Sequence, residues 1–99
     1  MNLTLMTDEE ILKEIALRAK KTRVSYDLRQ IDLSERSAVP LSSIRVFERS
    51  GKISFVYLVK VLRALSCIEA LDALFQPSEI EDLKSALKES EHSRQRVRK

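Results

Sequence analysis

The chain has 99 residues, enough for one domain or for one domain with a tail. A single Gly and two Pro argue against an all-β fold with many tight turns, and no apolar stretch approaches the roughly 20 residues of a membrane span. Cys67 is the only cysteine, which excludes an intrachain disulfide and suits a reducing compartment. With no visible signal peptide, we expect a soluble, cytoplasmic, all-α protein.

The net charge of +3 is unevenly distributed along the chain. Residues 18–63 hold eleven bases against four acids, whereas residues 1–17 and 64–91 are acidic, with net charges of −3 and −5. The last eight residues carry four bases and no acid. A basic block of this size is what a phosphate-binding face requires, and the acidic block after it suits a partner protein better than DNA.

The first predicted helix begins after Thr7, which with Glu10 forms a T-x-x-E capping box. Apolar residues at helical spacing follow, at positions 11, 12, 15, 16 and 19, and the same face continues to Val24 and Tyr26. We expect this helix to end near residues 26–27.

Two short helices are predicted next, over about 29–37 and 41–50, and Gly51 ends the second. Their inward residues are Ile31, Leu33, Val39, Ile44 and Phe47. Two short amphipathic helices joined by a turn indicate a helix-turn-helix.

Three further segments complete the chain. Ser54 caps a helix to about residue 66, although the run F-V-Y-L-V also allows a buried strand over 55–59; its length favours the helix. A helix over about 67–75 follows, and Ser78 with Glu81 opens a last helix over 79–90. The basic tail, residues 91–99, is predicted to be disordered. Its bases either reach phosphates or an acidic partner, or remain solvated: Arg94, Arg96, Arg98 and Lys99.

The helix over 41–50 has the side chains that a major-groove helix needs. Facing away from Ile44 and Phe47, it presents a set that we expect to reach base edges: Leu41, Ser42, Ser43, Arg45 and Val46. Arg49 and Lys52 are placed to reach the DNA backbone, and Gln30 lies where its amide and the helix N-terminus can meet a phosphate.

Residues 15–75 resemble the Xre/Cro-type helix-turn-helix family, which includes the lambda repressor DNA-binding domain. The resemblance lies in R-A-K-K-T-R-V-S-Y-D-L-R-Q, D-L-S-E-R-S-A-V, S-S-I-R-V-F-E-R-S-G-K and L-V-K-V-L-R-A-L. It implies a five-helix, lambda-repressor-like domain that is usually a dimeric repressor, here with an additional C-terminal helix. It also implies a phosphate or base role for Gln30, and base-reading positions for Leu41, Ser42, Arg45 and Val46.

The resemblance further implies a buried ion pair between Arg23 and Glu48 that ties the first helix to the recognition helix. Two positions depart from the family pattern. Ala38 stands where Gly is typical, which is unfavourable if the backbone there needs a positive φ. Pro40 replaces the usual Ser or Thr cap of the recognition helix, and Pro is tolerated at a helix start.

A narrower resemblance is to the small regulators paired with Hip-type kinase toxins. It lies in F-E-R-S-G-K-I-S, in L-R-A-L-S-C-I-E-A-L-D-A-L-F and in the basic tail. It implies an antitoxin that represses its own operon and binds a kinase-like toxin. The alternative from another class is a helical protein-interaction module that neutralises or scaffolds a partner without reading DNA.

The expected organisation is a DNA-binding domain over 1–76, a C-terminal helix over 77–90 and the tail. We expect the homodimer or partner contact to be formed by the two last helices through Ile68, Leu71, Phe75, Ile80, Leu83 and Leu87. One Cys and one His cannot build a four-ligand zinc site, so we expect no metal and no cofactor. The sequence contains no phosphate-binding glycine loop and no nucleophile elbow, and we expect no enzymatic activity.

Overall fold

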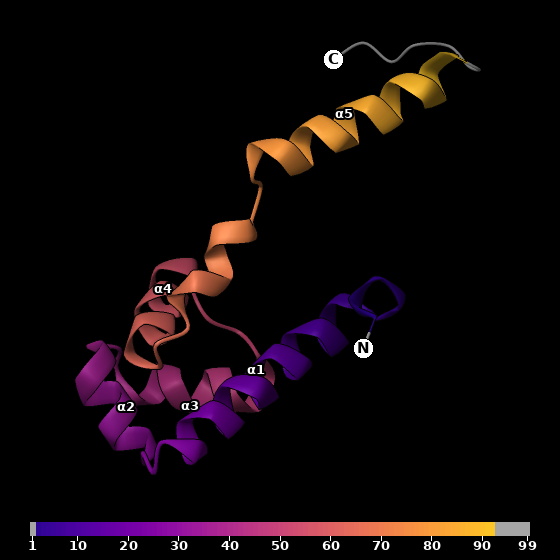
Figure 1. The fold of residues 1–99 in the computed structure, drawn as a ribbon. Helices are drawn as coiled ribbons and strands as arrows, with labels where there is room; N and C mark the ends of the chain where they lie inside the picture. Colours follow the sequence, from indigo (N-terminus) through magenta and orange to yellow (C-terminus); the bar gives the residue numbers. More distant parts are fainter. Residues whose placement is uncertain (1, 93–99) are drawn as a thin grey trace. The chain divides into compact units, whose positions relative to one another are not determined.

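The computed structural model describes residues 2–92 and, at 78–80 and 89–92, the backbone alone. A 3-10 helix, η1 (Leu3–Leu5), precedes four α-helices: α1 (Asp8–Ser25), α2 (Gln30–Ser37), α3 (Leu41–Ser50) and α4 (Phe55–Ala64). A second 3-10 helix, η2 (Ile68–Ala73), and α5 (Pro77–His92) follow (Figure 1). Residues 2–92 contain no strand, so the prediction of an all-α fold is confirmed.

Contacts divide the chain into two units, Met1–Ile68 and Glu69–Lys99. In the first unit α3 packs against both α1 and α2, and α2 also packs against α4. These helices enclose a core in which the largest buried side chains are Phe47, Leu33, Ile44, Leu65, Val39 and Val61. The second unit consists of α5 and most of η2.

Two of the three helix starts predicted from a side-chain cap are confirmed in atomic detail. The third, the Ser78–Glu81 box, is wrong, because α5 already begins at Pro77 and Ser78 lies inside it. The Thr7 hydroxyl accepts from the Glu10 N–H at 3.1 Å, and the Glu10 carboxylate accepts from the Thr7 N–H at 2.9 Å. Ser54 Oγ accepts from the Tyr57 N–H at 3.1 Å and opens α4. Residues 55–59 therefore belong to a helix and not to the alternative strand.

The two turns around α3 both contain a left-handed residue. Ala38 ends α2 with φ +60°, so the unfavourable conformation expected at this position is present. Gly51 ends α3 with φ +84°, as its predicted role as a helix terminator requires.

Residues 67–75 were predicted as an α-helix, and this prediction is wrong. Ser66 takes a left-handed conformation after α4, and η2 then winds as a 3-10 helix over Ile68–Ala73. Its half-buried apolar residues, Ile68 and Leu71, are three apart, which matches three residues per turn and not 3.6.

The predicted inward faces of two helices also need correction. Ile31 is 37% exposed on α2, where Leu33 alone supplies the apolar core contact. Val24 and Tyr26 are about half exposed, so the buried face of α1 ends before them. None of the described helices is both long and apolar enough to cross a lipid bilayer.

Candidate nucleic-acid interface

Helix α3 has one buried and one exposed face. Ile44 and Phe47 are fully buried, whereas Ser42, Arg45, Val46 and Arg49 are exposed. At about 100° per residue, these four side chains lie together on the side of the helix away from Ile44 and Phe47. Leu41 and Ser43 are half-buried at the margins of this face, and Lys52 is exposed just beyond the helix end.

A buried ion pair fixes α3 against α1. Arg23 Nε lies 2.7 Å from Glu48 Oε2, Arg23 Nη2 donates to Glu48 Oε1 at 3.0 Å, and the two side chains are only 9% and 4% exposed. Arg23 Nη1 also donates to the Leu28 carbonyl oxygen at 2.7 Å, which holds the connection between α1 and α2. The pair that the family resemblance implies is therefore present in the structure.

Gln30 joins this ion pair, a contact that the sequence reasoning missed. Its Nε2 donates to Glu48 Oε1 at 2.9 Å. Because an ionised carboxylate can only accept, the amide group must turn its NH₂ toward Glu48. One of the two amide N–H groups thus serves the Arg23–Glu48 pair, which leaves the other N–H and the helix N-terminus to meet a phosphate at the start of α2.

The burial of Glu48 decides the electrostatics of the exposed face. Glu48 is the single acid of α3, and it is turned inward and held by Arg23 and Gln30. The outward face of α3 therefore presents Arg45 and Arg49, and Lys52 follows just beyond Gly51, with no carboxylate between these three cations. A surface of this kind attracts phosphate groups.

The N-terminus of α3 is free of side-chain capping. Pro40 occupies the N-cap, where it makes no side-chain hydrogen bond, and the first turn contains no acid. The Pro40 carbonyl accepts from the N–H groups of Ser43 and Ile44 at 2.9 and 3.1 Å. The partial positive charge of this helix end is therefore not offset by a neighbouring carboxylate.

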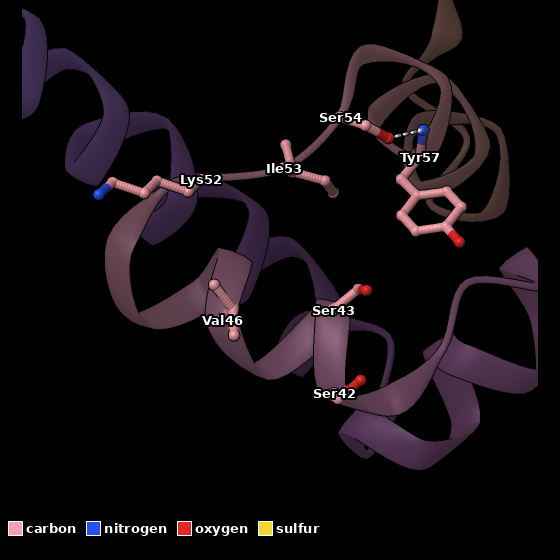
Figure 2. Close-up of a pocket in the computed structure, with 7 residues that line it drawn as sticks. All are labelled: Ser42, Ser43, Val46, Lys52, Ile53, Ser54 and Tyr57. Atoms are coloured by element: carbon pink, nitrogen blue, oxygen red, sulfur yellow. Dashed lines mark hydrogen bonds between the residues drawn. The ribbon is translucent and has the colours of Figure 1, made fainter.

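A hollow of about 290 Å³ borders the exposed face of α3. Figure 2 shows Ser42, Ser43 and Val46 on its α3 side, with the Tyr57 ring opposite them on α4. Residues 52–54 complete the lining. No local pattern in the sequence predicts this hollow, because it depends on how α3 and α4 meet.

The start of α2 contains a second, exposed charge pair. The Asp32 carboxylate accepts from the Arg29 N–H at 2.7 Å and from its guanidinium at 3.0 and 2.9 Å. Hydrogen bonding to the Arg29 side chain, and then to its backbone, lowers the pKa of Asp32 from 3.8 to about 2. Asp32 is therefore ionised at neutral pH and holds Arg29 in place at the N-terminus of α2.

The residues predicted for the dimer contact have different surroundings in the structure. Ile68 and Leu71 are half-buried, Phe75 is 83% exposed, and Leu83 and Leu87 are about 60% exposed. The side chain of Ile80 lies outside the described part of the chain, as do the tail bases at 94, 96, 98 and 99.

Among the side chains that the structure describes, no three of the His, Cys, Asp or Glu type gather as a metal site would require. Cys67 packs half-buried against the core, and its thiol donates to the Leu65 carbonyl oxygen at 3.3 Å.

Comparison with models of known protein families finds none that matches this chain, and comparison with curated proteins finds no significant match.

Proposed function

We propose that the protein is a sequence-specific DNA-binding regulator that reads a duplex operator through α3. The observation that carries the proposal is the separation of charge on α3. Its one acid is buried against Arg23 and Gln30, and its exposed side carries two guanidiniums next to small and apolar side chains. This arrangement suits a helix that lies in a groove lined by phosphates.

The exposed residues divide between two tasks. Arg49 and Lys52, toward the end of α3, supply phosphate contacts that carry no sequence information. Ser42 and Arg45 supply hydrogen bonds to base edges, while Leu41 and Val46 suit the methyl groups of thymine. Ser43 belongs to the same reading end and faces the hollow beside Tyr57.

Dimerisation and partner binding belong to the same proposal. A homodimer would place two recognition helices about one turn of duplex (~34 Å) apart, as a repressor of a two-fold symmetric operator requires. The exposed side chains of Phe75, Leu83 and Leu87 give the second unit an apolar surface for such a contact, or for a kinase-like toxin if the protein is an antitoxin.

The test is a selection of randomised duplexes with the wild-type protein, followed by mobility shifts on the selected sequence at several salt concentrations. We expect selective binding that weakens steeply with salt, and a loss of at least tenfold in Ser42→Ala/Arg45→Ala. Ser25→Ala/Lys21→Ala removes one hydroxyl and one cation from exposed positions of α1 and is the matched control.

Two results would decide for the rival function, a protein-interaction module that does not read DNA. One is the absence of any enriched sequence. The other is equal affinity of wild type and the α3 double variant for the selected duplex.

A further inference from the structure

A second hollow, of about 250 Å³, lies between the last turn of α2 and the second half of α4, on residues that the proposed DNA contact does not use. Its lining contains three cationic side chains from two helices, together with one hydroxyl and one methyl group: Arg36, Ser37, Lys60, Arg63 and Ala64.

None of the three cations forms an ion pair with a carboxylate that the structure describes, although the charge of Arg36 acts on Asp32 at longer range. The contact found for Lys60 is with the Tyr57 ring, whose centroid lies 5.9 Å from Lys60 Nζ. Helix α4 contains no acid at all. On α2, Asp32 is bound to Arg29, and Glu35 lies about 160° around the helix from Ser37. Three like charges around one hollow repel one another, so an anion placed among them is favoured.

The wall of the hollow supplies a buried donor. Ser37 is only 6% exposed, and its Oγ accepts from the Val39 N–H at 3.2 Å. The hydroxyl hydrogen finds no acceptor among the residues that the structure describes. It can therefore donate to a ligand without giving up the bond that orders the turn.

We propose that this hollow is a binding site for a phosphate group. Guanidinium groups match phosphate oxygens in geometry, and a lysine and a serine hydroxyl are common further donors. A dianion would neutralise most of the charge that gathers there. Because its ligands come from α2 and α4, a bound phosphate would tie these two helices together beside the Ala38 turn that ends α2.

The first measurement is a ¹H–¹⁵N NMR titration of the full chain with inorganic phosphate, with sodium chloride used to hold the ionic strength constant. We expect saturable shifts at the amides of residues 36–39 and 60–64. Arg36→Gln/Arg63→Gln should weaken binding at least tenfold, and Ser37→Ala should weaken it several-fold.

A matched control exists on α1, where Lys20, Lys21 and Ser25 line another open hollow with Leu17 and Val24. That hollow is lined by two ammonium groups and a hydroxyl. It has no guanidinium group and no buried hydrogen-bond donor. Lys20→Gln/Lys21→Gln should leave phosphate affinity unchanged. An equal loss of phosphate affinity in both double variants would overturn the proposal. Amide shifts that spread over every basic surface without saturation would overturn it as well.

The phosphate can come from a free phosphomonoester or from a DNA backbone, and a second arm separates these sources. If the source is DNA, Arg36→Gln/Arg63→Gln weakens binding to a selected duplex and lowers its salt dependence by about one to two ions. If the source is a free phosphomonoester, duplex affinity is unchanged while the NMR site is lost. The NMR arm needs no DNA, so the site stands or falls independently of the proposed regulator function.

Discussion

Gly51 lies so close to the backbone of Leu12 that a Cβ built at Gly51 would stand 2.4 Å from the Leu12 carbonyl oxygen. The residue that ends α3 thus also packs tightly against the backbone of α1. It meets two demands at once, since its φ of +84° also lies in the left-handed region. The approach of α1 to the end of α3 depends on the absence of a side chain at this position.

Gly51→Ala should therefore destabilise the first unit strongly. The methyl group must displace backbone atoms, and Ala is unfavourable at this φ, so we expect a loss of about 3 kcal/mol or more in the free energy of unfolding. Chemical denaturation followed by circular dichroism measures it. Lys52→Ala, at the next and exposed position, is the control and should change stability by less than about 0.5 kcal/mol. A loss below about 1 kcal/mol for Gly51→Ala would contradict the close packing on Leu12.

Removal of the Glu48 carboxylate should destabilise the protein far more than removal of an exposed one. Glu48→Leu leaves the Arg23 guanidinium buried without its counter-ion, which costs about 3–5 kcal/mol. Glu14→Leu breaks the partly exposed pair with Arg18 and should cost about 1 kcal/mol or less. The same denaturation experiment compares the two variants. In the double variant Arg23→Met/Glu48→Leu, most of the loss should be recovered; additive losses would show that the pair is not a coupled unit.

Replacement of Ala38 by Gly should stabilise the protein. Ala pays about 1–2 kcal/mol in the left-handed region, and the greater freedom of Gly in the unfolded chain offsets part of the gain. We expect a net increase of about 0.5–1 kcal/mol, measured as a higher denaturation midpoint. Ala19→Gly, inside α1, makes the same chemical change at an ordinary helical position and should instead destabilise by about 1 kcal/mol. If both variants lose stability equally, Ala38 is not strained.

The features that local chemistry determines were predictable from the sequence. The Thr7–Glu10 box, the bounds of α3 and the termination at Gly51 each depend on residues within one helical turn of one another. The hydrogen bond from Gln30 to Glu48 joins residues 18 apart, and no local pattern marks it. The hollow between α3 and α4 depends on packing in the same way. The sequence does not predict that η2 winds as a 3-10 helix, because its residues suit an α-helix equally well.

The lowered pKa of Asp32 gives the start of α2 a defined pH dependence. Above about pH 5 the carboxylate is ionised in both the folded and the unfolded chain, so the stabilisation from its bonds to Arg29 is fully present. As the pH falls toward about 2, the folded-state carboxylate takes up its proton and this stabilisation is lost. Asp32→Asn keeps an oxygen that accepts from the Arg29 N–H, so it removes mainly the charge. The difference in unfolding free energy between wild type and Asp32→Asn should be constant from pH 5 to 7 and should shrink toward zero near pH 2.

Glu35→Gln, also on α2, controls for the general effect of removing an acid. A difference that persists unchanged to pH 2, or a ¹³C titration of the Asp32 carboxyl centred near 3.8, would show that Arg29 does not hold this carboxylate in solution.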